Sequence, residues 1–295
     1  MGPDTPSEPA ADAAPLSPSH MPPERGKDRG AAGPAGTAPI GGTTQAGEAG
    51  TVRVDIDRSD AGPAGQAQKP SRWRRLIRLL GRVLVIWFGG SLALVVLYWI
   101  VPPPITPLMV IRLISGEGLS KTWRSYDDIA PNLARAVITS EDSLFCQHNG
   151  FDWSALDKAW QRNQRAKRIH GGSTISNQTA KNVFLWPDRT YIRKAFEAYF
   201  TVLIEALWTK KRILEVYLNV VEWGHGVYGA EAAARSQFKK SAHDLTRHEA
   251  ALLAAILPNP RQWSASKPSA YIRGRASTIE ARMADTADPT GDPCK

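Results

Sequence analysis

The pattern of apolar and polar positions first marks a membrane segment. Residues 83–101 read VLVIWFGGSLALVVLYWIV and contain no charged side chain. At about 1.5 Å per residue, such a helix would be roughly 28 Å long, close to the thickness of a bilayer's hydrocarbon core. Tyr98 and Trp99 stand where interfacial aromatic residues belong, and Pro102–Pro104 end the helix. The pattern therefore predicts a transmembrane helix over 83–101.

Two other interpretations of this segment fit less well. A buried core helix is usually shorter and carries a polar face, which 83–101 lacks. A cleaved signal peptide should lie near residue 1 and end in a small-residue cleavage site, whereas prolines follow this segment. We therefore expect an uncleaved anchor.

Helical periodicity dominates the chain beyond the anchor. The apolar segment 105–120 is expected to pack on the membrane end of the domain, to dip into the head groups, or both. Helices are predicted over about 131–144, 153–168, 171–186, 191–220, from 230 onward, 247–257 and 268–284. A break is expected near Thr209–Lys211, and Thr246 and Glu249 form a capping box. No segment alternates as a strand does, so the fold class is mainly α.

Composition divides the chain into segments. Residues 1–70 are rich in Pro, Ala, Gly, Ser and Thr and contain no aromatic residue. Such a segment cannot bury enough apolar surface to offset the cost of ordering its backbone, so we expect it to be disordered. The predicted organisation is a disordered cytoplasmic tail (1–70), a basic juxtamembrane segment (71–82), the transmembrane helix (83–101), one folded domain (105–285) and a flexible tail (286–295).

The net charge of +9 would suit nucleic acid, anionic lipid or a phosphate-bearing substrate. The positions of the basic residues along the chain distinguish among these partners. The basic residues just before the span are Lys69, Arg72, Arg74, Arg75, Arg78 and Arg82. Only Arg112 is basic in the comparable stretch after it. The positive-inside rule puts the N-terminus in the cytoplasm and the domain outside, which argues against nucleic acid as a partner.

The chain has two cysteines, Cys146 and Cys294, and their spacing with the histidines suggests no metal site. An oxidising compartment would permit a bridge between them. The position of Cys294 in a polar tail argues against that bridge, so the pairing stays open at this point.

Two acidic residues, Glu141 and Asp142, end a predicted helix just before a Gly turn. A helix C-terminus is an unfavourable place for carboxylates, because the macrodipole is negative there. Local physics gives them no stabilising role, which favours a functional one. A solvated surface pair is the alternative.

A second cluster begins at Gly171-Gly172-Ser173-Thr174 and continues with amides and a lysine, Lys181. Backbone amides at a Gly-rich helix start can hold an anion, and Lys181 with Arg189 downstream can neutralise a diphosphate. An N-cap formed by Ser173 or Thr174 is the simpler interpretation.

The third cluster contains Arg193 and Glu197, which stand four residues apart. They can form an ordinary ion pair on one helix face. The functional interpretation instead places Glu197 across a cleft from Glu141.

Together these clusters resemble the motifs of family 51 glycosyltransferases, the peptidoglycan glycosyltransferases. The patterns ED-x-x-F-x-x-H-x-G-F-D, G-x-S-T-I-S-x-Q-x-x-K-N and R-K-x-x-E occur in the family's order. Two further blocks, 211–219 and 224–239, also fit, and the resemblance covers about 125–265. Pro107–Leu113 and Phe184–Pro187 look closest to the monofunctional, proteobacterial type. The resemblance implies a lysozyme-like helical domain.

The resemblance also implies a reaction: polymerisation of lipid II into glycan strands with release of undecaprenyl diphosphate. Glu141 would be the catalytic base, and Glu197 would aid departure of the donor, directly or through a divalent metal (Mg or Mn). No other cofactor is required. The implied substrate-binding residues are Asp142, Ser173, Thr174, Gln178, Lys181, Asn182, Arg189 and Arg193. Implied partners are lipid II, the nascent glycan strand, membrane lipid and other cell-wall synthesis or division proteins, at the bacterial inner membrane.

The chain departs from the family pattern at Asn177, where the family usually has Gln. Ser236 and Lys239 match a transpeptidase S-x-x-K pattern, but no Ser-x-Asn or Lys-Thr-Gly partner follows, so we expect no peptide cross-linking. Two other functions fit the sequence less well. A lysozyme-like hydrolase would have no diphosphate for Lys181 and Arg189 to hold, and intact Glu141 and Glu197 argue against a non-catalytic membrane scaffold.

Overall fold

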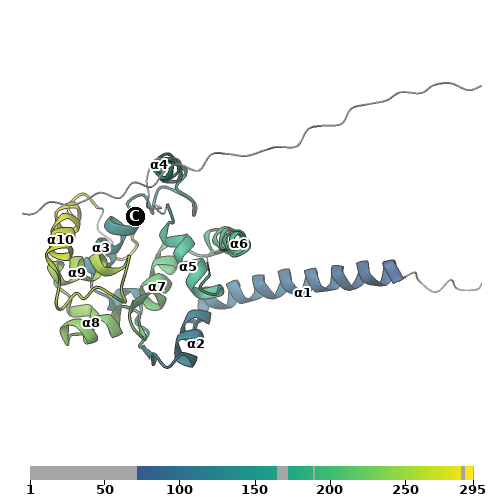
Figure 1. Ribbon diagram of the computed structural model, residues 1–295, viewed down its shortest axis with the longest axis horizontal. Coiled ribbons are helices and arrows are strands. Elements are labelled where there is room, and N and C mark those ends of the chain that lie inside the picture. The colour runs from purple at the N-terminus through teal and green to yellow at the C-terminus, as the bar shows by residue number, and fades with distance from the viewer. Residues whose placement is uncertain (1–71, 165–171, 189, 287–289, 295) are drawn as a thin grey trace, which may run out of the picture. The chain divides into compact units, whose positions relative to one another are not determined.

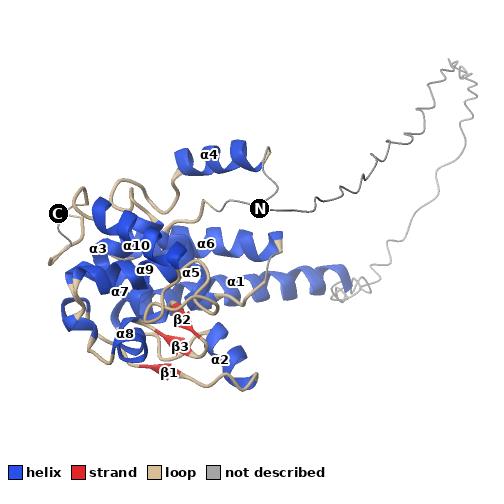
Figure 2. Cartoon of the chain, turned by 60° about the vertical axis from the view of Figure 1, so that its left-hand side comes forward, coloured by secondary structure: helices blue, strands red, loops and turns tan. Residues whose placement is uncertain are grey.

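The computed structural model describes residues 72–164, 172–188, 190–286 and 290–294. The predicted disordered tail 1–70 and the predicted site residue Arg189 lie outside these residues. In chain order the helices are α1 (Arg72–Ile100), α2 (Pro107–Ile114), α3 (Pro131–Glu141), α4 (Trp153–Asn163), α5 (Ile175–Phe184), α6 (Tyr191–Leu207), α7 (Lys210–Val220), α8 (Ala230–Phe238), α9 (Arg247–Ile256) and α10 (Ala270–Arg282). The mainly α prediction is confirmed, and Figure 2 shows how helices dominate the domain.

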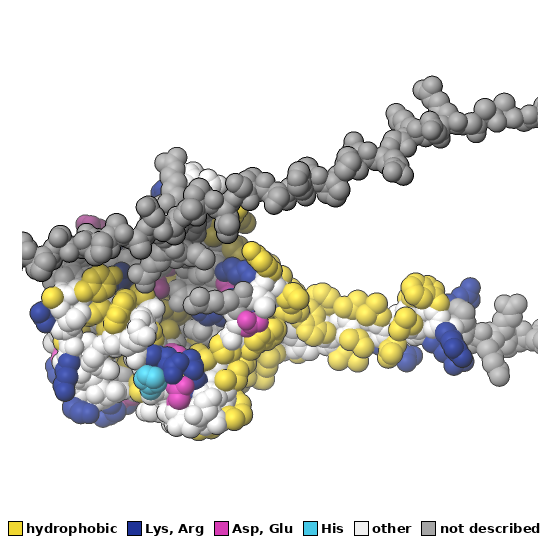
Figure 3. All heavy atoms as spheres, in the orientation of Figure 1, with side chains coloured by type: hydrophobic (Ala, Val, Ile, Leu, Met, Phe, Trp, Pro, Cys, Tyr) yellow, Lys and Arg dark blue, Asp and Glu magenta, His cyan; other side chains and the backbone are white. Residues whose placement is uncertain are grey.

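Helix α1 is longer than the predicted span, because the basic segment 71–82 continues it as helix from Arg72. Arginine and leucine favour helix, and no proline interrupts them. It is the one helix in the described part of the chain that is long and apolar enough to cross a membrane. Figure 1 shows α1 projecting from the domain, and Figure 3 shows apolar side chains along it with basic ones toward its far end. These features fit a single-pass inner-membrane protein.

The second half of α1 packs on the rest of the domain. The ring of Trp87 lies 5.4 Å from that of Phe196 and 5.1 Å from that of Tyr199, both on α6. The hydroxyls of Ser91 and Tyr199 are 2.8 Å apart, and Trp208 Nε1 donates a hydrogen bond to the Val95 carbonyl. The anchor is therefore built into the domain rather than joined to it only through a loop.

The domain core forms where α5 packs on α6 and α7, and where α9 packs on α3 and α10. Ile175, Ile204, Leu214 and Leu253 are fully buried there. Threonine and serine side chains begin most of these helices by capping their first backbone amides. The capping box of Thr246 and Glu249 is present at the start of α9, as predicted.

The predicted break in the 191–220 stretch is also present. Trp208 ends α6, and Thr209 caps α7 by accepting a hydrogen bond from the Arg212 amide. Two helices therefore replace one, and their different directions let α7 pack on α5 while α6 packs on α1.

A small sheet, which the sequence pattern did not indicate, accompanies the helices. Three very short strands, β1 (Ser120–Lys121), β2 (Glu222–Gly224) and β3 (Val227–Tyr228), form a sheet in the order β1-β3-β2. Strands of two or three residues are too short to show alternation, so the sequence pattern could not reveal them. Gly226 turns the β2–β3 hairpin with φ +66°, and a Cβ there would lie 2.3 Å from the Glu117 carbonyl oxygen.

Two described residues of the C-terminal tail, Thr286 and Cys294, contact the domain. Cys146 and Cys294 form a disulfide with a Cα–Cα distance of 5.2 Å. The hydroxyls of Thr139 and Thr286 are 2.7 Å apart, and Cys294 packs against the edge of the hydrophobic core. Tertiary packing thus ties the end of the chain to the loop after α3, and the polar composition of the tail gave no sign of this.

Candidate active site

Glu141 is the last residue of α3, whose inner face buries Leu133, Ala136 and Val137. Its side chain reaches α5, where Gln178 Nε2 donates a hydrogen bond to Glu141 Oε2 at 3.0 Å. Burial raises the pKa of Glu141, while the bond from Gln178 and the charges of Arg275 and Lys181 oppose that rise. A partly exposed carboxyl with an elevated pKa is a stronger base than an ordinary glutamate.

Lys181 stands three residues after Gln178 on the same face of α5. Burial lowers its pKa, and the negative charges of Glu197 and Glu141 oppose that fall. The two glutamates, from helices far apart in sequence, therefore both act electrostatically on this one lysine.

Glu197 is buried on α6 and holds two cations. Its Oε2 accepts a hydrogen bond from Arg193 Nη1 at 2.7 Å, and its Oε1 pairs with Lys194 Nζ. The expected ion pair between Arg193 and Glu197 is therefore present. Because both carboxylate oxygens are engaged, Glu197 fixes the position of the Arg193 guanidinium.

A cavity of about 470 Å³ lies beside these groups. It is lined by Leu108, Arg112, Gln178, Lys181, Asn182, Leu185, Trp186, Pro187, Asp188, Arg193, Val221, Glu222, Leu257 and Pro260. Four predicted site residues, Gln178, Lys181, Asn182 and Arg193, thus meet in one space. Neither glutamate is among the described lining residues, but Glu141 bonds to Gln178 and Glu197 to Arg193.

Asp142 and Thr174 are not among the described residues that line this cavity. Asp142 Oδ1 lies 2.9 Å from His148 Nε2, and its Oδ2 accepts a hydrogen bond from the Ile175 amide. Thr174 caps α5 and donates to the Gly150 carbonyl at 2.6 Å. Both residues hold the loop after α3 against the start of α5, and their predicted contact with substrate stays a prediction.

Ser173 and Asn177, near the start of α5, make few side-chain contacts that the structure describes. Ser173 is exposed, and its hydroxyl lies 3.4 Å from Lys194 Nζ. Asn177, the departure from the family pattern, is buried, and its Oδ1 has no hydrogen-bond partner among the residues that the structure describes.

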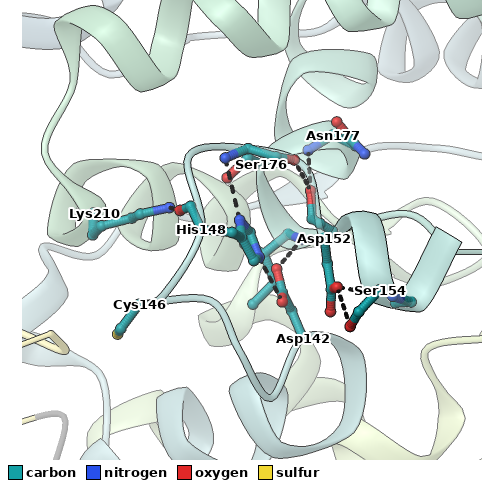
Figure 4. Close-up of polar contacts among 12 residues, drawn as sticks. Asp142, Cys146, His148, Asp152, Ser154, Ser176, Asn177 and Lys210 are labelled. Atoms are coloured by element: carbon teal, nitrogen blue, oxygen red, sulfur yellow. Dashed lines mark hydrogen bonds and ion pairs between the residues drawn. The ribbon is translucent and has the colours of Figure 1, made fainter. Parts of the chain in front are cut away.

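The loop after α3 has a second support that the sequence did not indicate. Lys210 Nζ donates to the His148 carbonyl at 2.7 Å and to Glu205 Oε1 at 2.8 Å, and Ser176 Oγ also bonds to Glu205. Figure 4 shows the Lys210 side chain reaching toward His148. These residues come from three helices and a loop, so only the folded chain brings them together.

The residues around Glu197 do not fit a metal held by the protein. Both of its oxygens already pair with cations, Arg193 and Lys194. Within the described ranges, no group of three or more His, Cys, Asp or Glu side chains could hold a metal ion. We therefore assign no step of the reaction to a metal at this position.

Two residues that line the cavity were missed as site residues. Arg112 appeared only in the charge count of the anchor flank, and Glu222 was assigned no role. A charged residue inside the apolar segment 105–120 was the available signal for Arg112. Glu222 gave none, because its relation to the cavity depends on the β2–β3 hairpin.

Comparison with known proteins agrees with this arrangement. Residues 109–284 match the family model described as transglycosylase. A protein of Rhodospirillum centenum is 57% identical over 211 residues, which cover 70% of this chain and 91% of the relative. A protein of Caulobacter vibrioides is 54% identical over 207 residues, covering 70% and 90%, and one of Bdellovibrio bacteriovorus is 49% identical over 228 residues, covering 75% and 91%. Each of the three is named a biosynthetic peptidoglycan transglycosylase.

Proposed function

The chain belongs to the transglycosylase family, and from this premise we propose that it is a peptidoglycan glycosyltransferase that polymerises lipid II into glycan strands. The observation that carries the proposal is the cavity in which Gln178, bonded to Glu141, meets the cations Lys181 and Arg193. Glu141 can activate an acceptor hydroxyl, and Lys181 and Arg193 can hold an anionic leaving group.

Glu141 acts as the general base. A sugar hydroxyl is a weak nucleophile at neutral pH, so a carboxylate must take its proton as the new bond forms. The acceptor oxygen bonds to the anomeric carbon of the donor, while the bond from that carbon to the diphosphate oxygen breaks. A single displacement of this kind inverts the anomeric centre without a covalent enzyme intermediate.

The departing diphosphate needs positive charge and hydrogen-bond donors. Lys181 and Arg193 supply the charge, and Asn182, which also lines the cavity, supplies an amide. Glu197 contributes indirectly, since it holds the guanidinium of Arg193 in place. In this mechanism undecaprenyl diphosphate leaves along the cationic wall of the cavity.

The anchor suits a lipid-linked substrate. Confining the enzyme to the same membrane raises the frequency of encounter and limits the orientations that must be searched. Helix α2 exposes Val110, Ile111, Leu113 and Ile114, which offer an apolar surface near the membrane end of the domain. The basic flank before the span orients the domain to the periplasmic side of the inner membrane.

A hydrolase that cleaves finished glycan is the main alternative. Such an enzyme would need a carboxylate but no diphosphate site, whereas Lys181 and Arg193 lie together in the cavity. The length of the products separates the two activities, because a polymerase lengthens chains and a hydrolase shortens them.

The test is incubation of the detergent-solubilised full chain with fluorescently labelled lipid II, with and without a divalent metal or a chelator. The wild-type protein should form long glycan. Glu141→Gln should lose about 10²- to 10⁴-fold in rate, because the amide cannot take a proton. Asp244→Asn, an exposed carboxyl on the surface, is the matched control and should keep wild-type activity. Polymerisation at the wild-type rate by Glu141→Gln would refute the assignment of the base.

A further inference from the structure

One part of the cavity is not used by the mechanism above. Besides the residues of α5 and α6, the lining includes Arg112 from α2, Glu222 from β2, and the apolar residues Leu108, Leu257 and Pro260. The two charged side chains are largely buried, with 25% and 13% of their surfaces exposed. Charged groups in such a place are costly unless they have partners.

Glu117 already pairs with the basic side chains beside this part of the cavity. Its Oε1 accepts hydrogen bonds from Arg112 Nη1 at 3.1 Å and from Arg261 Nη2 at 2.9 Å. Its Oε2 lies 3.4 Å from His225 Nδ1. Glu117 therefore fixes the Arg112 guanidinium and uses one of its terminal nitrogens.

What remains is one donor and one acceptor facing each other. Arg112 Nε lies 3.9 Å from Glu222 Oε1, which is too far for a direct hydrogen bond. Within the described part of the chain, neither atom has any hydrogen-bond partner, and the hydroxyl of Tyr228 on the neighbouring strand has none either. A ligand group that accepts a hydrogen bond from Arg112 Nε and donates one to Glu222 Oε1 would give each atom a partner.

The chemistry of this pair selects a neutral hydroxyl. An anion would accept from Arg112 but would meet the carboxylate of Glu222, while a cation would meet the guanidinium. Leu257 and Pro260 add apolar surface on which the C–H groups of a sugar ring can rest. The same cavity holds Lys181 and Arg193, so one substrate can reach both groups.

We propose that Arg112 and Glu222 form a sugar-recognising subsite, in which a ring hydroxyl of the glycan substrate bridges Arg112 Nε and Glu222 Oε1. This inference rests on the proposed function, and it makes Glu222 a specificity-determining residue instead of a catalytic one. Removing the acceptor should weaken substrate binding while leaving the chemical step intact.

The experiment compares full-length Glu222→Leu and Glu222→Gln with the wild type in detergent, using labelled lipid II as the probe. Glu222→Leu should raise KM about tenfold, the effect of losing one bridging polar contact, and should change kcat less than twofold. Glu222→Gln keeps a side-chain carbonyl acceptor and should stay close to the wild type. Glu280→Leu, which removes a carboxyl paired with His248 on the surface, is the matched control and should change neither parameter.

Thermal unfolding separates recognition from a structural role. Glu222 Oε1 makes no hydrogen bond with the described residues, although it lies 3.9 Å from Arg112 Nε, so Glu222→Leu should unfold close to the wild-type temperature. The proposal is overturned if KM for Glu222→Leu stays at the wild-type value, or if its unfolding temperature falls by several degrees as kcat and KM change together.

A binding measurement keeps this proposal separate from the proposed function. Anisotropy of labelled lipid II gives a Kd for the wild type, for Glu222→Leu and for both in the Glu141→Gln background, where turnover is not needed. A Kd about tenfold higher in the Glu222→Leu proteins supports the subsite even if the wild type fails to polymerise lipid II. Failure of the wild type to polymerise would refute the proposed function alone. An unchanged Kd overturns the subsite whatever the activity.

Discussion

The side-chain amide of Gln178 connects Glu141 to Tyr217: Nε2 donates to Glu141 Oε2 at 3.0 Å, and Oε1 accepts from the Tyr217 hydroxyl at 3.4 Å. Because the tyrosine donates to Oε1, the amide must present its nitrogen to the glutamate. The orientation of this amide thus favours the ionised form of Glu141, against the burial that favours the protonated form.

Replacing Gln178 should shift the acidic limb of the activity profile. Gln178→Leu removes the hydrogen bond that lowers the pKa of Glu141, so this pKa should rise further above the ordinary value of 4.5. The base must be ionised to act, and the acidic limb of kcat against pH should therefore move to higher pH. Tyr217→Phe removes only the outer contact and should cause a smaller shift. An acidic limb that does not move in Gln178→Leu would contradict this account.

Lys181 should determine the alkaline limb. Burial lowers its pKa, so its charge should be lost, and activity should decline, below the ordinary value of 10.5. Between the lowered pKa and 10.5 the unfolded chain binds more protons at this residue, so its contribution to stability rises with pH. The decline should therefore occur without unfolding, as circular dichroism at each pH can check. Lys181→Arg keeps its charge and should move the limb upward; an unmoved limb would exclude Lys181 as its cause.

The disulfide should contribute strongly to stability. Cys146 and Cys294 are 148 residues apart, so their bond closes a long loop and restricts the unfolded chain. Cys294→Ser should lower the free energy of unfolding by about 2–5 kcal/mol, measured by urea denaturation without a reductant. The double variant with Cys146→Ser should match the single one. If a reductant left the wild-type transition unchanged, the bridge would be absent in solution.

Gly150 should tolerate no side chain. Its φ is +91°, and a Cβ there would lie 2.8 Å from Thr201 Cγ2. Gly150→Ala should destabilise the fold by about 1–3 kcal/mol, because it strains the loop that Asp142 and Thr174 hold. Gly274→Ala is the control, since nothing lies within 4 Å of the added carbon in the middle of α10. This control should be neutral or stabilising by up to about 1 kcal/mol in the same urea titration.

The helices were predictable because their signals are local. Periodicity in the α3 and α9 segments and the capping box at Thr246 depend on residues within a few positions of one another. The pairing of β1 with β3 and the disulfide were not predictable, because each joins segments separated by about a hundred residues or more. Ser120 pairs with Val227, and Cys146 pairs with Cys294, only after the helices between them have packed.

The site was partly predictable for a related reason. Motif spacing indicated that Gln178, Lys181 and Arg193 belong together, and the cavity contains all three. Spacing does not say which way a side chain points, so it could not separate Asp142, which supports the loop, from Glu141 beside it. Glu222 was missed because a hairpin, and not a motif, directs it to the cavity.

The contacts of α1 with α6 have a mechanical consequence. Arg212 also donates to the carbonyl of Tyr98, so the membrane helix is fastened to the enzyme at several levels from Trp87 to Tyr98. An enzyme attached in this way cannot move freely relative to its transmembrane helix. Any tilt or rotation of the transmembrane helix therefore also turns the active-site cavity. The helix thereby sets the height above the bilayer and the direction in which the growing glycan strand leaves the enzyme.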